Sequence, residues 1–236
     1  MSAFNSVVST QARPLPVIIL ADNSGSMFDD GKLDSLKHAL VDMIKSFKGS
    51  SSSSLEAEIY VSIVSFGNNA ATMVIEPKSA SEITDSEPLL NAINGMQANG
   101  NTPLGLAITK LVNMLEHRES YPSRAYRPFL VLASDGMPND EWEQPLKQLL
   151  SSERGKKATR LALSIGADAD NAMLEKFVDN KGIPVFKANG VDGIRKFFKC
   201  VTMSAIKSSQ SARPGEIASD EVVKILTEDD DDLFGN

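Results

Sequence analysis

Five oxygen-bearing side chains have types and spacings that suit a hard metal ion. Asp22, Ser24 and Ser26 alternate along one short segment, and Thr102 and Asp135 follow much later in the chain. Together they offer two carboxylates and three hydroxyls, with no imidazole or thiol among them. Such ligands suit Mg²⁺, which keeps an octahedral arrangement and some of its water, and Mn²⁺ accepts the same ligands. The sequence therefore predicts one metal site formed by these five residues.

Each part of this set also has a simpler interpretation when it is taken alone. The polar segment after Asp22 is typical of a turn or a helix cap. Thr102 before Pro103 is typical of a capping residue with proline at the first helical position. Asp135 before a glycine is typical of an ordinary turn. The metal interpretation therefore depends on elements that bring the three segments together.

Those elements alternate between apolar strands and amphipathic helices. Continuous apolar runs indicate buried strands, and apolar residues three or four apart indicate helices. We expect strands at residues 15–21, 59–64, 129–133 and 161–165, and helices around residues 33–47, 104–115 and 194–201. A Gly-Asn-Asn turn then leads to residues 71–75, which indicates a hairpin and an antiparallel edge strand. The predicted fold is a doubly wound α/β sandwich of about five parallel strands and one antiparallel edge strand, with helices on both faces.

This fold would place the five residues at one edge of the sheet. In an open parallel sheet, ligands bind beyond the carboxyl ends of the strands. Asp22 follows the first predicted strand, Asp135 follows the strand at 129–133, and Thr102 precedes the helix at 104–115. Because three loops converge in this way, the metal interpretation is favoured over three unrelated turns.

The arrangement resembles the metal-ion-dependent adhesion site of von Willebrand factor A (VWA) domains, over roughly residues 14–206. All five positions of that site are matched. The segments at residues 22–27, 102–105 and 134–136 are most similar to the bacterial TerY-like proteins of tellurium-resistance gene clusters. The resemblance implies that two serines, with the threonine or an aspartate, ligate Mg²⁺ directly, with Mn²⁺ or Ca²⁺ as substitutes. It also implies a non-enzymatic module whose protein partner supplies a further carboxylate, and a stress-response system that includes a kinase and a phosphatase.

Charge and composition divide the chain and exclude some classes of partner. The net charge is -7, and residues 214–236 hold eight acids and one base, so the acidic tail carries all of it. A neutral body with an acidic tail does not suit a nucleic-acid binder, and no apolar run is long enough to cross a membrane. Cys200 is the only cysteine, which favours a reducing cytoplasm. We expect a leader at residues 1–13, a VWA domain at 14–206 and a flexible acidic tail at 207–236.

Several alternatives stay open from the sequence. The same metal could activate water in a Mg²⁺-dependent hydrolase or phosphatase, or the site could be vestigial. Asp29 and Asp30 could bind a second cation or stabilise the start of a helix. Asp170 is interpreted as a helix cap. The acidic tail could be a docking segment that offers a carboxylate to the metal, or only a solubilising appendage.

Overall fold

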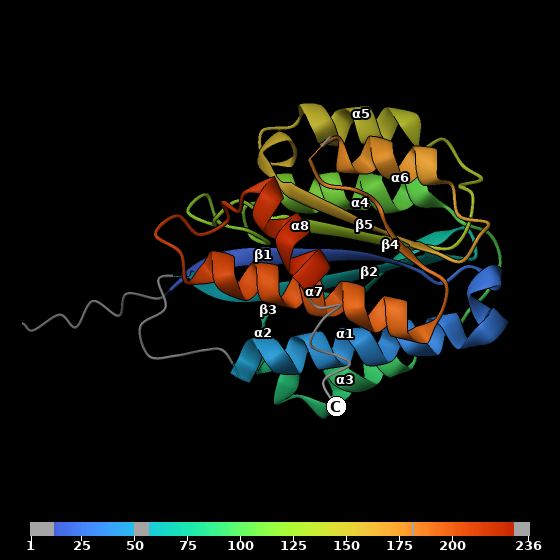
Figure 1. Cartoon of the computed structure of the whole chain (residues 1–236), viewed down its shortest axis with the longest axis horizontal. Helices are drawn as coiled ribbons and strands as arrows, with labels where there is room; N and C mark the ends of the chain where they lie inside the picture. Colours follow the sequence, from blue (N-terminus) through green and yellow to red (C-terminus); the bar gives the residue numbers. More distant parts are fainter. Residues whose placement is uncertain (1–11, 50–56, 181, 229–236) are drawn as a thin grey trace, which may run out of the picture.

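The computed structural model describes residues 12–49, 57–180 and 182–228, which form a three-layer α/β sandwich (Figure 1). The middle layer is a six-stranded sheet in the order β3-β2-β1-β4-β5-β6. Its strands are β1 (Arg13–Asp22), β2 (Ala57–Gly67), β3 (Ala70–Ser79), β4 (Phe129–Ser134), β5 (Thr159–Ile165) and β6 (Phe186–Ala188). Strand β3 runs antiparallel to β2, and the other neighbours pair in parallel. The predicted doubly wound fold with an antiparallel edge strand is confirmed.

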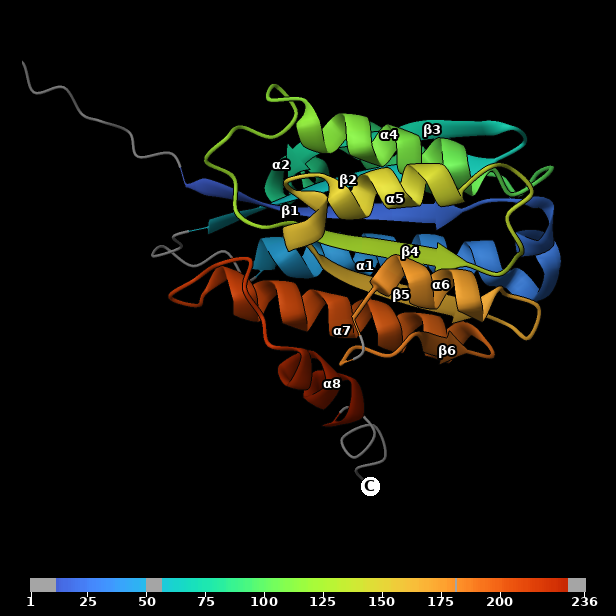
Figure 2. The same ribbon diagram turned by 90° about the horizontal axis from the view of Figure 1, so that it is seen from above.

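Helices cover both faces of this sheet (Figures 1 and 2). One face carries α1 (Lys32–Gly49), α2 (Ala80–Thr84), α3 (Glu87–Asn94) and α7 (Val191–Ser209), and α1 packs directly along α7. The other face carries α4 (Leu104–Glu116), α5 (Glu143–Ser151) and α6 (Asn171–Val178). None of the described helices is long and apolar enough to cross a membrane.

The central strands are buried because helices cover them on both sides. Every residue of β4 is buried, as is every residue of β1 after Arg13. A strand that is covered on both faces has a continuous apolar sequence rather than an alternating one. This is why the sequence predicted these strands. Asp22, the last residue of β1, is a charged residue at the end of such a run.

The β2–β3 hairpin turns through two asparagines, as its sequence predicts. Asn68 and Asn69 have φ angles of 48° and 60°. Positive φ at both central positions fits the right-handed twist of the paired strands, and asparagine tolerates it better than most residues. The turn therefore fixes the edge strand beside β2, close to the carboxyl ends of the parallel strands.

The structure differs from the sequence expectation after residue 207. Helix α7 continues to Ser209, and a further helix, α8 (Ser219–Glu228), packs against it. Val222 and Ile225 are buried, and Lys207 Nζ lies 2.5 Å from Glu221 Oε1. The expectation of a flexible tail does not hold for residues 207–228, because the short apolar face of α8 is stabilised by packing on α7. The acidic residues 229–232, the serine run at 50–54 and most of the leader lie outside the described residues.

Replacing Val222 by Asp should release α8 without unfolding the body. Val222 is completely buried, so a carboxylate there loses its apolar burial and adds a desolvated charge, a cost of about 2 kcal/mol or more. Hydrogen exchange should show that the amides of α8 lose protection while those of β1 and β4 keep it. The matched control is Val223→Asp, because Val223 is only half-buried. Equal protection of α8 in both variants would contradict this role for Val222.

Candidate metal centre

The carboxylate of Asp22 is held by the ends of two neighbouring strands. Its Oδ1 accepts a hydrogen bond of 2.8 Å from the backbone N–H of Ser24, which curls the loop after β1. Its Oδ2 accepts a hydrogen bond of 2.5 Å from the hydroxyl of Ser134, the last residue of β4. Asp22 and Ser134 are both completely buried. The side chain is therefore fixed in direction at the carboxyl edge of the sheet.

The two serines of the loop connect Asp22 to Asp135. Ser24 Oγ lies 3.2 Å from Ser26 Oγ, and Ser26 Oγ donates a hydrogen bond of 2.7 Å to Asp135 Oδ1. A Cβ placed on Gly136 would lie 3.2 Å from Thr102 Oγ1 and 3.7 Å from Ser26 Oγ. All five residues predicted from the sequence are thus brought to one small region.

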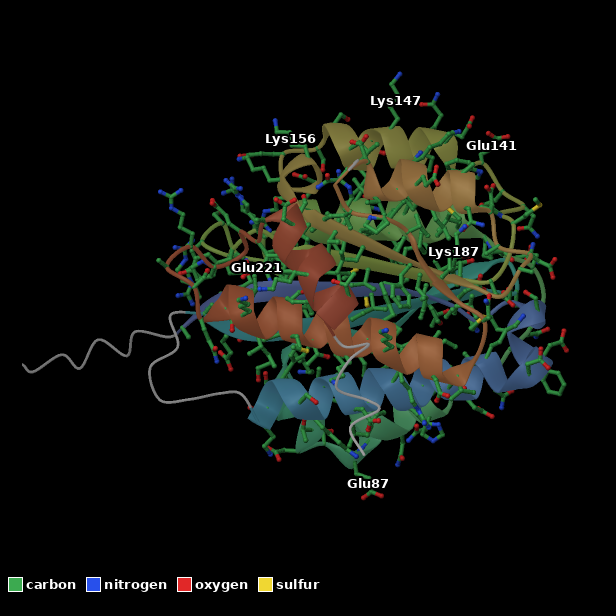
Figure 3. All side chains as sticks on the ribbon, viewed as in Figure 1. Glu87, Glu141, Lys147, Lys156, Lys187 and Glu221 are labelled. Carbon is green, nitrogen blue, oxygen red and sulfur yellow. The ribbon has the colours of Figure 1, made fainter. Side chains whose placement is uncertain are left out.

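One of the five residues faces solvent. Asp22, Ser24, Thr102 and Asp135 are buried, whereas Ser26 is exposed. In Figure 3, Glu141 is labelled at this end of the molecule and Lys156 at the opposite end. Ser26 is therefore the residue of the five that a group from solvent can contact directly.

Backbone contacts tie the loop that carries Thr102 to the loop after β1. The N–H of Gly25 donates to the carbonyl of Gly100 over 2.8 Å, and the N–H of Asn99 donates to the carbonyl of Asn23 over 2.9 Å. Gly100 has a φ of 66°, and a Cβ there would lie 2.7 Å from the Cα of Asn68. Glycine is therefore required at Gly100, both for its conformation and for the close approach of the hairpin.

Thr102 does not cap helix α4, contrary to its simplest interpretation. Helix α4 begins at Leu104 after Pro103, with no side-chain cap from Pro103. The carboxylate of Asp140 accepts hydrogen bonds from the N–H groups of Gly105 and Leu106, at 2.9 and 3.0 Å. Asp140 thus takes the capping role, and its negative charge suits the helix N-terminus. The Thr102 hydroxyl is left to face Gly136 and the site.

Burial raises the pKa of Asp22 from 3.8 to about 6. The main cause is desolvation, which disfavours the charged form. The hydrogen bonds from Ser134 and Ser24 lower the pKa and partly offset that effect, and the nearby charge of Asp135 raises it slightly. The site therefore holds a carboxylate whose negative charge is incompletely compensated by its protein neighbours.

Lys32 is a site residue that the sequence analysis did not identify. Its Nζ donates a hydrogen bond of 2.9 Å to Asp135 Oδ2, and its side chain is 19% exposed. Desolvation lowers the pKa of Lys32, but the hydrogen bond and charge of Asp135, together with the charges of Asp29 and Asp30, outweigh it, so the net shift is upward. The ammonium therefore stays charged and compensates Asp135, whereas Asp22 receives only hydroxyl and amide partners. Lys32 is the first residue of α1, and only the fold shows that it reaches Asp135.

The donor set fits a hard divalent cation. No group of three or more His, Cys, Asp or Glu side chains that could hold a metal occurs in the described part of the chain. A metal here would therefore rely on hydroxyls in addition to the two carboxylates. Hydroxyl and carboxylate oxygens are the ligands that Mg²⁺, Ca²⁺ and Mn²⁺ prefer. The desolvated carboxylate of Asp22 also gains most from a cation close by.

The other acidic residues at this edge have different surroundings. Asp29 and Asp30 are exposed in a 3₁₀ segment, η1 (Gly25–Gly31), where Asp30 has a φ of 54°. They belong to no metal-binding cluster among the described residues. Asp170 caps α6, because its Oδ1 accepts a hydrogen bond of 3.0 Å from the N–H of Met173. The capping interpretation of Asp170 is confirmed.

The family model described as von Willebrand factor type A domain matches residues 17–199, which is more than half of the chain. The protein belongs to this family. The matched residues include all five side chains of the site. No curated protein matches the sequence.

Several solved structures share the fold of this chain. A von Willebrand factor type A protein from Catenulispora acidiphila is 20% identical, with a TM-score of 0.65, over 84% of this chain and 43% of that one. Proximal thread matrix protein 1 from the mussel byssus, described with a zinc-occupied metal-ion-dependent adhesion site, is 16% identical, with a TM-score of 0.62, over 83% and 48%. The ArnB paralog VWA2 from Sulfolobus acidocaldarius is 16% identical, with a TM-score of 0.55, over 84% and 46%. The VWA chain described here spans less than half of each.

Because of Asp22, the metal-free VWA domain should be less stable at pH 7 than at pH 4. Its folded pKa of about 6 lies above the unfolded value of 3.8, so its contribution to stability is fully present below pH 4 and is lost as the pH rises through 6. The free energy of unfolding of the wild type minus that of Asp22→Asn should fall by on the order of 3 kcal/mol from pH 4 to pH 7. Urea unfolding in EDTA measures this difference. A difference that stays constant or rises with pH contradicts the assignment.

Proposed function

We propose that this VWA domain is a divalent-metal-dependent protein-interaction module without enzymatic activity. The observation that carries the proposal is the convergence of Asp22, Ser24, Ser26, Thr102 and Asp135 at one solvent-facing edge. Mg²⁺ is the proposed native ion, with Mn²⁺ or Ca²⁺ as substitutes, because the donors are hard oxygens. The proposed partner is a protein that supplies a carboxylate to the metal.

The charge of the site supports a carboxylate as the partner group. A bound divalent cation supplies two positive charges, and three of its five proposed ligands are neutral hydroxyls. Lys32 already compensates Asp135 through a hydrogen bond of 2.9 Å. The occupied site would therefore keep positive charge toward solvent, on the side of the exposed Ser26, and would attract an anionic group.

The proposed ligand roles follow the positions of the oxygens. Ser24, Ser26 and Thr102 would offer their hydroxyl oxygens directly, whereas Asp22 and Asp135 would act directly or through water. Ser134 and the N–H of Ser24 hold Asp22 in place from both sides. The mussel byssus relative, described with zinc in its adhesion site, supports a metal at the corresponding place in the fold.

A hydrolase that uses the same metal is less consistent with these surroundings. General bases work best when their pKa lies near the operating pH and they reach the substrate proton. Asp22 is enclosed by Ser24 and Ser134 and completely buried, so it cannot contact a substrate proton. His38 and His117 are exposed, in α1 and directly after α4, as expected for surface histidines.

We further propose that the protein works in the cytoplasm of a bacterium, in a stress or tellurite-resistance system with a kinase and a phosphatase. The support is the resemblance to TerY-like proteins in the segments at residues 22–27, 102–105 and 134–136. Cys200 is buried and is the only cysteine of the sequence, which is consistent with a reducing compartment.

Replacing Ser26 by Ala should weaken Mg²⁺ binding roughly tenfold or more, because one ligand oxygen and its link to Asp135 are both lost. Isothermal titration calorimetry with Mg²⁺ measures the affinity. Ser46→Ala is the matched control, because Ser46 lies on α1 and bonds only to the carbonyl of Asp42. The proposal fails if the wild type binds no divalent ion, or if both variants bind Mg²⁺ equally well.

The proposed system makes a separate prediction. Removal of the gene should sensitise the source cell to tellurite, and the wild-type gene should restore resistance whereas Thr102→Ala should not. In the same cells, affinity capture should recover a kinase or phosphatase of the system with the wild type in Mg²⁺, but not in EDTA or with Thr102→Ala. Full resistance conferred by Thr102→Ala would rule out a role for the metal site in this system.

A further inference from the structure

Two large apolar side chains are exposed at the edge of the sheet that carries the five proposed ligands, called the metal edge here. Among the described residues, the exposed large apolar side chains are Phe28, Leu106, Met137, Val191 and Met203. Phe28 is 78% exposed and Met137 is 70% exposed, and each lies two residues after a proposed ligand, Ser26 or Asp135. Two residues span at most ~7 Å of chain, so both side chains begin close to the metal position. Exposed apolar side chains that gather at one place mark interaction surfaces more often than single ones do.

A pocket lies directly beside Phe28. Its volume is about 320 Å³, and its apolar lining comes from Met27, Phe28, Leu33, Met96 and Ala98. Met27 follows Ser26 in the chain and is completely buried, so the floor of the pocket is continuous with the loop that carries the ligands. The pocket can accept one bulky apolar side chain next to a group held at the metal.

Two exposed acidic residues, Asp29 and Asp30, follow Phe28 in the chain, next to a pocket whose own lining includes Asp34 and Lys37. Neither Asp29 nor Asp30 forms an ion pair with a described residue, although both interact electrostatically with Lys32. The nearby cations are already committed, since Lys32 pairs with Asp135 and Lys37 pairs with Asp34. A partner segment would therefore meet a positive metal, an apolar pocket and an acidic rim within a short distance.

We propose that the metal edge selects a partner segment that combines three features: a carboxylate for the metal, an adjacent bulky apolar side chain for the pocket beside Phe28, and a Lys or Arg facing Asp29 and Asp30. This inference rests on the proposed function, because the carboxylate needs the metal. It adds the sequence pattern by which the partner is recognised.

The chain's own acidic segment matches this pattern only in part. Leu233 and Phe234 follow directly after four aspartates, so a carboxylate next to an apolar side chain is present. However, residues 228–236 contain five acids and no base. Several carboxylates near Asp29 and Asp30 would repel one another, which favours a separate, mixed-charge partner over this segment.

The test uses a phage library of random twelve-residue peptides, selected on the full-length protein in Mg²⁺ and eluted with EDTA. The eluted peptides should be enriched in an acid beside Leu, Ile, Met or Phe, with Lys or Arg a few positions away. Acid-containing peptides without the apolar neighbour or the base overturn this inference and leave the proposed function standing. Purely acidic peptides overturn it in favour of segments such as residues 228–234. If no peptide depends on Mg²⁺, the proposed function itself is contradicted.

Variants then locate the contact. Phe28→Ser and Met137→Ser should each weaken binding of the most enriched synthetic peptide by about tenfold, which is typical for an anchor residue. Asp29→Asn should weaken it a few-fold. Met203→Ser is the matched control, because Met203 is an exposed methionine on α7. Thermal melting monitors the fold of each variant. Equal peptide affinities for Phe28→Ser, Met137→Ser and Met203→Ser, in variants that melt like the wild type, overturn the inference.

Discussion

The buried carboxylate of Asp22 is the constraint around which the metal edge is built. A carboxylate at the end of a fully buried strand has lost most of its hydration, and its raised pKa records that loss. The carboxylate of Asp22 accepts hydrogen bonds from the Ser134 hydroxyl and the Ser24 amide. It has no cationic partner there, because Lys32 pairs with Asp135 instead. The charge of Asp22 is therefore left for a metal ion to compensate. In the metal-free state, the desolvation of Asp22 opposes stability.

The loops that surround Asp22 are positioned by one another rather than by the core. The Gly25–Gly100 and Asn23–Asn99 backbone hydrogen bonds, and the close contact of Gly100 with Asn68, join three loops into one unit. Each hydrogen bond contributes only about 1 kcal/mol net. Together they hold the Thr102 hydroxyl beside the loop of Ser26 even though these residues are far apart in sequence. A metal site made largely of neutral hydroxyls needs such support, because an ion pair orders only Asp135 among its five ligands.

The sequence predicted those parts that local patterns specify. The long apolar strands β1 and β4 and the polar residues directly after them are local features, so the five site residues were identified together. The pairing of Lys32 with Asp135 depends on how α1 begins beside β4, and no local pattern signals it. Strand β6 has only three residues, too few for a periodic signal. The sequence did not predict helix α8, because this helix is stabilised by the packing of its few buried residues on α7 rather than by a strong helix propensity of its own.

The exposure of Ser26 links metal binding to specificity. Ser26 is exposed while the other four residues are buried, so a partner group that contacts Ser26 also lies close to the segment that follows it. That segment places Met27 inward, Phe28 outward and Asp29 in solvent. A group that approaches the metal over this segment would bring its neighbours against an apolar side chain and an acidic one. The metal would supply attraction to almost any carboxylate, and the residues after Ser26 would decide which carboxylates are accepted.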